Sequence, residues 1–316
     1  MKKVELPAYF STLNKGKVTL YIKKEYENRM SGQDIEGLFN LCKEPSPGSN
    51  HADKNELNDS HQGRATCKTL LMESLGSETF IVREYWHGGM VGKIFKDFFC
   101  DGMRPVRELS VCEAASRGGI KTTEIVAIVK NKVFGPLYKF RLVTKEITES
   151  IDLIELLLHS GENRLFKQKK QIINELAKAV NDMHNVDIYH ADLHLKNILV
   201  KSDHGGGVQV YIIDLDKSKQ YEKIGFQRKM KNILRLDRSV VKLRRKNQEL
   251  FSKTFPVSNA DRVRFLKKYI ELDSESVKPL RHYLQSYNNT HALHKLWWRV
   301  ARGKMKNARG IKEICL

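Results

Sequence analysis

The stretch that decides the fold is His190-Ala-Asp-Leu-His-Leu-Lys-Asn-Ile-Leu-Val200, followed after a polar break by Val208-Gln-Val-Tyr-Ile-Ile-Asp-Leu-Asp216. Two short β-rich runs, 197–201 and 208–213, flank a turn cluster at 202–207 that contains one aspartate and three glycines. This pattern predicts a β-hairpin. Because a hairpin brings its two ends together, we expect Asp192, Asn197 and Asp214 to converge on one point.

Three oxygen-bearing side chains at one point suit phosphoryl transfer. Asp192 can accept a proton from an acceptor hydroxyl, and Asn197 and Asp214 offer the hard oxygen ligands that Mg²⁺ prefers. The spacing His-x-Asp-Leu-x-x-x-Asn, which starts at His190, is that of the protein-kinase catalytic loop, and Asp214-Leu-Asp216 stands where kinases carry Asp-Phe-Gly. The motif predicts His190 and Asp192 as catalytic residues, Asn197 and Asp214 as metal ligands, and ATP and Mg²⁺ as cofactors.

Two other interpretations of this stretch remain open. The polar residues can belong to a hairpin mouth without chemistry, or His190 and His194 can form a metal-binding pair at i, i+4 spacing. The metal pair is disfavoured because no glutamate follows His190 and the segment leads into a strand.

The composition indicates a cytoplasmic globular protein. The 316 residues are 41% hydrophobic, enough for one substantial core or two lobes. The five cysteines are odd in number and contain no C-x-x-C pair, so we expect reduced thiols and no structural zinc site. No apolar leader follows the first methionine and no run of 18 apolar residues occurs, so any membrane contact is expected to be peripheral.

Positive charge is concentrated in the last third of the chain. Lysine and arginine number 56 against 37 acidic residues, and the segment 222–316 alone holds 24 basic and 8 acidic residues. Such an excess favours a polyanionic partner: nucleic acid, an anionic membrane face or a phosphorylated substrate.

The segment before the hairpin suggests a phosphate-binding lobe. A small-residue loop at Gly63-Arg64, a β-rich run and a turn precede the strand that ends at Arg83, where kinases place a lysine that holds the α- and β-phosphates. A surface arginine on an ordinary hairpin is the alternative, and Lys93 and Lys96 are further candidates for the phosphate contact.

A helix at 106–117, ended by Gly118-Gly119, follows this strand. We expect Glu108 on it, rather than Glu113, to pair with Arg83 as the αC glutamate of kinases does, although either can be a surface glutamate. Two strands at 125–133 and 137–144, a hinge at 145–150 and helical periodicity from residue 151 complete the pattern. The predicted division is an N-lobe at 1–145 and a C-lobe at 146–316.

These motifs together resemble the lipopolysaccharide core kinases, which phosphorylate 3-deoxy-D-manno-octulosonic acid (Kdo) or heptose. The stretches 190–197 and 213–218 carry the resemblance to the family, which covers roughly residues 60–245. Four more stretches are similar to the Kdo branch: Gly63-Arg64, Val82-Arg83 with the glycine-rich 88–93, Arg107-Glu108, and 225–228 with 232–239.

The resemblance implies an α+β, bilobed protein-kinase-like fold with a β-rich N-lobe and a helical C-lobe. It implies transfer of the ATP γ-phosphate to a sugar hydroxyl of the lipopolysaccharide inner core, foremost Kdo on a lipid A-linked acceptor, with Gly63, Arg64, Arg83 and Glu108 at the nucleotide. It also implies a peripheral position on the cytoplasmic face of the inner membrane, an anionic membrane surface as partner and no nucleic acid.

Other functions stay open at this point. They are a heptose kinase of the same family, an aminoglycoside or RIO-type kinase on the same scaffold, and a non-catalytic basic module that docks on membrane or RNA. In the tail, the run around Trp297 and Trp298 is typical either of a helix lying in a membrane interface or of a last helix packed on the C-lobe.

Overall fold

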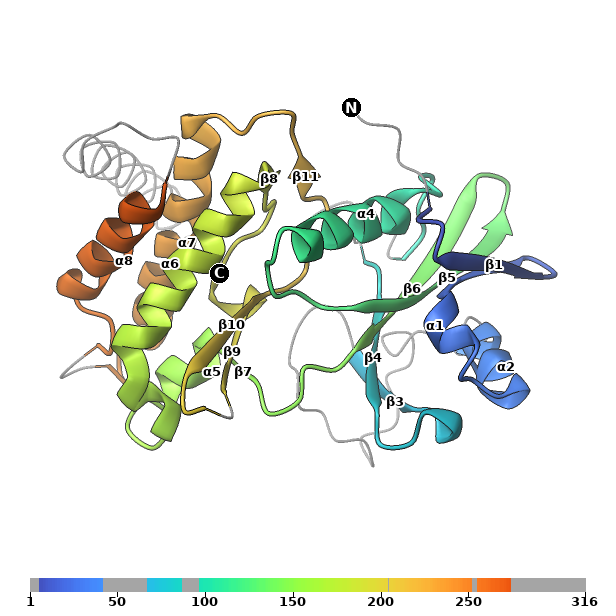
Figure 1. The fold of residues 1–316 in the computed structure, drawn as a ribbon, viewed down its shortest axis with the longest axis horizontal. Coiled ribbons are helices and arrows are strands. Elements are labelled where there is room, and N and C mark those ends of the chain that lie inside the picture. The colour runs from blue at the N-terminus through green and yellow to red at the C-terminus, as the bar shows by residue number, and fades with distance from the viewer. Residues whose placement is uncertain (1–5, 42–66, 87–96, 204, 252–254, 274–316) are drawn as a thin grey trace, which may run out of the picture. The chain divides into compact units, whose positions relative to one another are not determined.

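The computed structural model describes residues 6–41, 67–86, 97–203, 205–251 and 255–273. The chain divides into two compact units. Unit 1 comprises Met1–Ser150 and Tyr211–Gln220, and unit 2 comprises Ile151–Val210 and Tyr221–Leu316. The fold class predicted from the sequence is confirmed, because antiparallel strands dominate the first unit and helices dominate the second (Figure 1).

Unit 1 is built on a six-stranded antiparallel sheet with the order β1-β2-β5-β6-β4-β3. Its strands are β1 (Phe10–Lys15), β2 (Val18–Lys23), β3 (Cys67–Leu71), β4 (Thr79–Glu84), β5 (Ile125–Phe134) and β6 (Leu137–Lys145). Alternate residues of β4, Phe80 and Val82, are buried in the core, as period-two patterning requires. Arg83, which follows Val82, is therefore carried on the opposite side of the strand.

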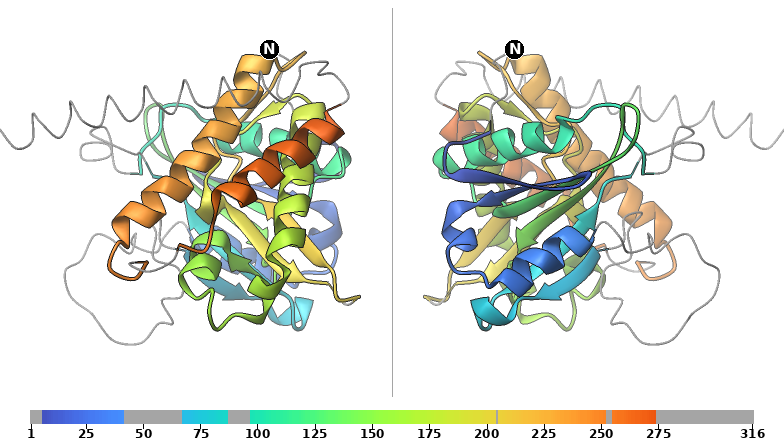
Figure 2. Two further views of the ribbon diagram at one scale, coloured as in Figure 1. Left: turned by 90° about the vertical axis from the view of Figure 1, so that its left-hand side faces the viewer. Right: turned by 90° about the vertical axis from the view of Figure 1, so that its right-hand side faces the viewer.

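Helices cover both faces of this sheet. Helix α4 (Arg104–Arg117) lies on one face, and α1 (Lys24–Glu27) and α2 (Gly32–Asn40) lie on the other (Figure 2, right). Helix α2 begins at Ser31, whose hydroxyl accepts a hydrogen bond from the backbone N–H of Asp34 in a capping box. The sequence analysis named no element before residue 63, so α1 and α2 are additions to it.

The segment that carries Asp214 belongs to unit 1 although it follows the hairpin in sequence. The backbone N–H of Ile212 donates to the carbonyl of Lys121 at 2.9 Å, just beyond the end of α4. Leu215 is buried, and the short strand β11 (Lys219–Gln220) ends the segment. Asp214 and Asp216 are thus held by the same unit as Arg83 and Glu108.

Unit 2 is mainly helical. Its helices are α5 (Leu153–Leu158), α6 (Lys169–Asn185), α7 (Phe226–Lys246) and α8 (Asn259–Leu272), with 3-10 turns η3 (Arg164–Gln168) and η4 (Leu195–Asn197). The short strands are β7 (Ile151–Asp152), β8 (Ile188–Tyr189), β9 (Ile198–Ser202) and β10 (Val208–Ile212), of which β10, β9 and β7 form one small sheet in that order. Helices α6, α7 and α8 lie side by side (Figures 1 and 2), and the predicted hairpin is the pair β9–β10.

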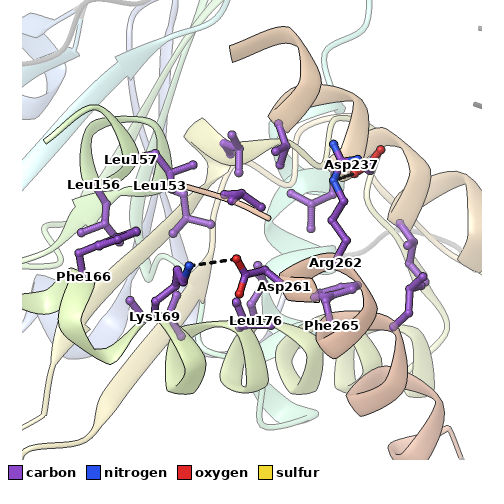
Figure 3. A pocket seen from close by; sticks show the side chains of 18 residues that line it. Leu153, Leu156, Leu157, Phe166, Lys169, Leu176, Asp237, Asp261, Arg262 and Phe265 are labelled. Carbon is purple, nitrogen blue, oxygen red and sulfur yellow. Dashed lines mark hydrogen bonds and ion pairs between the residues drawn. The ribbon is translucent and has the colours of Figure 1, made fainter. Parts of the chain in front are cut away.

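The helices of unit 2 surround an apolar cavity of about 120 Å³ (Figure 3). Leucine, isoleucine, valine and phenylalanine side chains from all four helices line it, together with Leu195 of η4. The charged groups at the cavity are paired with one another: Lys169 Nζ lies 3.0 Å from Asp261 Oδ2, and Arg262 Nε lies 3.0 Å from Asp237 Oδ1. Because these charges are paired with one another, the cavity wall is mainly apolar.

Candidate active site

The catalytic loop, residues 190–197, connects β8 to β9 in unit 2. Leu193 and Leu195 are buried at 0% and 3% exposure, and these two anchors fix the path of the backbone between them. His190 is also fully buried, and its Nδ1 accepts a hydrogen bond of 3.0 Å from the backbone N–H of Asp192. His190 was predicted as a catalytic residue; its ring is buried and holds the backbone of Asp192, and its role in the reaction stays a prediction.

Side chains of helix α7 form hydrogen bonds with the backbone of the catalytic loop. Asn232 accepts a hydrogen bond from the His190 N–H at 3.1 Å and donates one to the His190 carbonyl at 2.7 Å. Ser239, two turns further along α7, accepts a bond of 3.2 Å from the Leu195 N–H. Two side chains of one helix thus hold the two ends of the loop.

The buried His184 of α6 links Asn232 of α7 to Tyr269 of α8. His184 Nε2 lies 3.2 Å from Asn232 Oδ1, and His184 Nδ1 lies 2.8 Å from the Tyr269 hydroxyl. Because the Asn232 oxygen only accepts, Nε2 carries the proton and the tyrosine donates to Nδ1. Burial lowers the pKa of His184 to about 4, so the ring is neutral near pH 7.

Asp192 carries the one carboxylate of the loop 190–197, and 62% of its side chain is exposed. His194 Nε2 lies 3.4 Å from one of its oxygens, and Arg235 Nη1 of α7 lies 3.4 Å from the other. The hydrogen bond from His194, with a further contribution from Arg235, lowers the pKa of Asp192 to about 2. The carboxylate is therefore ionised at neutral pH and can accept a hydroxyl proton.

Asn197, the last residue of the catalytic loop, contacts the backbone of Asp192. Its Nδ2 donates to the Asp192 carbonyl at 3.0 Å, and its side chain is buried. That bond orients the amide, and within the described residues its oxygen makes no hydrogen bond, so it is available as a metal ligand. The described residues contain no cluster of three or more histidine, cysteine, aspartate or glutamate side chains that could hold a metal.

Unit 1 contains a second cluster, here called the unit 1 cluster: Arg83, Tyr85, Arg104, Glu108, Asp214 and Asp216. Arg83 on β4 donates to Glu108 of α4 with one terminal nitrogen and to Asp214 with the other. Glu108 is buried, and the Tyr85 hydroxyl donates to its second oxygen at 2.5 Å. Burial raises the pKa of the Glu108 carboxyl, and the Arg83 charge opposes that rise.

The backbone at Asp214 is unusual. Its φ of 60° lies in the left-handed region, which costs a residue with a Cβ on the order of 1 kcal/mol or more. The ion pair with Arg83 is one contact that holds the side chain in this conformation.

Asp216 is held in the same unit by a bidentate ion pair. Arg104, in the first turn of α4, donates through Nε at 2.9 Å to Oδ1 of Asp216 and through a terminal nitrogen to Oδ2. The Arg104 guanidinium also lies 4.6 Å from the ring centre of Phe99 and 5.3 Å from that of Tyr85. Both carboxylates of the Asp214-Leu215-Asp216 motif are therefore positioned by arginines.

The structure brings some of the predicted residues together. Asp192 and Asn197 are adjacent in unit 2, and Arg83, Glu108 and Asp214 are joined in unit 1. The convergence of the two groups, and the roles assigned to each residue, stay predictions. Gly63, Arg64, Lys93, Lys96 and the tail segment around Trp297 lie outside the described residues.

Sequence reasoning missed four residues of these clusters: Tyr85, Arg104, Asn232 and Arg235. Asp216, Asn232 and Arg235 stood in quoted motifs but received no role. One feature of the sequence could have indicated Asn232 and Arg235. Both are polar residues that stand among the apolar residues of a helix that follows the Asp214 motif. Nothing local to Tyr85 or Arg104 indicates their partners, which come from distant segments.

Unit 2 carries an ionised aspartate and an oriented asparagine on one loop, and unit 1 carries an arginine–glutamate pair that holds a second aspartate. Each group is of the kind that phosphotransferases of the protein-kinase-like class use. The comparisons with known proteins agree. The model of the lipopolysaccharide kinase (Kdo/WaaP) family matches residues 49–269. The chain belongs to this family, and it is a kinase-type transferase of lipopolysaccharide biosynthesis.

Individual relatives support the same assignment. The chain is 30% identical over 199 residues to the 3-deoxy-D-manno-octulosonic acid kinase of Photobacterium profundum, covering 62% of this chain and 78% of that one. It is 27% identical over 187 residues to the enzyme of the same name from Pasteurella multocida, covering 58% and 74%. Among solved structures, WaaP in complex with acyl carrier protein matches with a TM-score of 0.53, covering 87% of this chain and 96% of that chain. At 16% identity, that likeness concerns the fold.

Proposed function

We propose that the protein transfers the γ-phosphate of ATP, with Mg²⁺, to a hydroxyl of Kdo in a lipid A-linked inner core. The observation that carries this proposal is the exposed, ionised Asp192, held by His190, Asn197 and α7. The names of the relatives support Kdo as the acceptor sugar.

In the proposed reaction, the acceptor oxygen forms a bond to the γ-phosphorus while the bond between that phosphorus and the β,γ-bridging oxygen breaks. The hydroxyl proton passes to the Asp192 carboxylate and then to solvent, and ADP is the second product. Arg83 contacts the phosphates, and Glu108 and Asp214 hold its guanidinium in place. Because Asp192 has a pKa of about 2, it is a weak base, and positioning contributes more than proton affinity.

Mg²⁺ fits the residues present. Asp214 and Asn197 each supply a hard oxygen, and Mg²⁺ is usually bound by one or two protein oxygens together with phosphates and water. A bound cation would neutralise charge on the transferring phosphate. Asp214 shares only one of its two oxygens with Arg83.

A position at the cytoplasmic face of an anionic inner membrane is part of the proposal. The net charge of +19 suits both an anionic acceptor and an anionic bilayer surface. Within the part of the chain that the structure describes, no helix is long and apolar enough to cross a membrane.

The test is direct phosphorylation with the purified full-length chain. We expect ATP- and Mg²⁺-dependent addition of one phosphate to a lipid A-linked Kdo acceptor, detected by mass spectrometry, and addition by the Asp192→Asn variant that is slower by at least about 10²-fold. Phosphate found on heptose instead of Kdo would assign the chain to the heptose kinases of the family. No phosphate on any inner-core acceptor contradicts the proposal.

A further inference from the structure

Helix α7 carries nine basic residues and one acidic residue along its 21 positions. Six of the basic residues follow one another at spacings of three or four: Arg228, Lys231, Arg235, Arg238, Lys242 and Arg245. At 3.6 residues per turn these six lie within an arc of about 100° and extend over about 25 Å. We call this face the α7 basic stripe; α7 is the long orange helix in the left view of Figure 2.

The charge of the stripe is not neutralised by the helix itself. Its single acidic residue, Asp237, is buried and paired with Arg262. Lys231, Arg238 and Lys242 form no ion pair with any of the described residues. Solvated helix faces usually mix the two signs of charge, whereas a one-sign stripe produces a field that attracts anions.

The stripe is continuous with the catalytic loop. Arg235, in its middle, lies 3.4 Å from Asp192 Oδ1. On the face of the helix next to the stripe, Asn232 and Ser239 hold the two ends of the loop. The stripe is therefore fixed relative to the carboxylate that is proposed to receive the acceptor proton.

We infer that the α7 basic stripe is the acceptor-docking surface and binds the anionic groups, phosphates and sugar carboxylates, of a multiply anionic glycolipid. This inference rests on the proposed function and deepens it by naming the residues that select the acceptor. Lys231 and Arg238 stand about one helical turn, 5 Å, from Arg235, and Arg228 and Lys242 stand about two turns away. Those separations match the size of one or two sugar units. The basic residues of the stripe can therefore bind anionic groups that lie one or two sugars from the reacting hydroxyl.

The test compares two double variants that remove the same charge. Arg238→Gln with Lys242→Gln neutralises the stripe, and Lys178→Gln with Arg244→Gln is the matched control, because these exposed residues lie on α6 and on another face of α7. The acceptor is the deacylated, phosphate-bearing sugar portion of lipid A-linked Kdo, which forms no bilayer. We expect the stripe variant to raise the acceptor KM, and the acceptor Kd measured without ATP, by roughly five- to tenfold.

Three further readouts make the result specific. The KM for ATP and the melting temperature of the stripe variant should equal those of wild type. The dependence of the acceptor Kd on salt should be weaker in the stripe variant than in the control, since fewer charges are screened. Restoring charge with Arg238→Lys and Lys242→Arg should restore binding.

Several outcomes would overturn the inference. Equal acceptor affinity in the stripe and control variants would show that the stripe does not bind the acceptor. Unchanged affinity for the deacylated acceptor, with loss of binding only to vesicles of anionic phospholipid, would make the stripe a membrane surface. If wild type phosphorylates no inner-core acceptor, the proposed function fails, and the Kd comparison still decides whether the stripe binds anionic glycans.

Discussion

Asp192 combines high exposure with a low pKa, and this combination sets its expected role. It is too weak a base to deprotonate a sugar hydroxyl before the reaction begins, so it orients the hydroxyl and takes up the proton as the new bond forms. We expect Asp192→Asn to lower the transfer rate by about 10² to 10⁴-fold. Folding and ATP binding should be retained, which circular dichroism and nucleotide titration can check. Turnover close to wild type would show that Asp192 is not the base.

Asn197 and Asp214 are expected to act through the metal ion. Asp214→Ala should abolish Mg²⁺-dependent transfer because it removes the charged ligand. Asn197→Ala removes a neutral ligand, so high Mg²⁺ or Mn²⁺ should restore part of the activity. The measurement is the initial rate as a function of metal concentration. An unchanged metal dependence in both variants would show that neither residue is a ligand.

Arg83 stands where kinases usually carry lysine, and the unit 1 cluster explains what arginine adds. Its forked guanidinium donates to Glu108 and Asp214 at once, which a single ammonium group does less well. We expect Arg83→Lys to raise the KM for ATP and lower kcat, with a larger effect in Arg83→Ala. In a double-mutant cycle with Glu108→Ala, the losses should be less than additive. Strictly additive losses would show that the two residues do not cooperate in catalysis.

Helix α7 is the element on which the catalytic loop depends. Asn232→Leu keeps the side-chain volume but leaves buried groups of His190 and His184 without their hydrogen bonds. We expect it to lower the free energy of unfolding by about 2 to 4 kcal/mol, and to lower kcat more than it changes the KM for ATP. Asn247→Leu, near the end of α7, is the control and should be nearly neutral in both measurements. Equal effects of the two substitutions would contradict the bracing role.

Most elements could be predicted because their signals are local. The hairpin and α4 each have matching periodicity and end signals in the sequence, and their observed bounds lie within a few residues of the predicted ones. Helix α2 was missed because two glycines, Gly32 and Gly37, interrupt its pattern, although Ser31 and Asp34 gave a capping signal. The site was predicted only where the motif has fixed spacing. Arg104 and Tyr85 were missed because tertiary packing alone brings their partners to them.

At the scale of the whole molecule, His184 makes stability depend on pH. Its pKa is lowered from 6.5 to about 4 in the folded state. Between these values the unfolded chain binds more protons than the folded chain, so the free energy of unfolding falls as the pH decreases. One pKa unit corresponds to about 1.4 kcal/mol, so this group alone should cost about 2 kcal/mol by about pH 5 relative to pH 7.

Denaturant titrations of wild type and His184→Gln across this pH range measure the effect. The variant should be less stable near pH 7, because it loses part of the bonding to Asn232 and Tyr269, and its stability should fall less steeply on acidification. Parallel pH profiles for the two proteins would show that another group is responsible.

Helix α7 carries both the residues that hold the catalytic loop and the exposed basic residues of the stripe. This arrangement has a consequence for how acceptor specificity changes within the family. The inward side chains, Asn232 and Ser239, hold the catalytic loop by hydrogen bonds, whereas outward residues such as Arg238 and Lys242 form no hydrogen bond or ion pair with it among the described residues. Substitutions on the outward side can therefore change acceptor binding without disturbing the catalytic loop. We expect descendants of one ancestral enzyme to have acquired different core sugars mainly by exchanging the outward residues of this single helix.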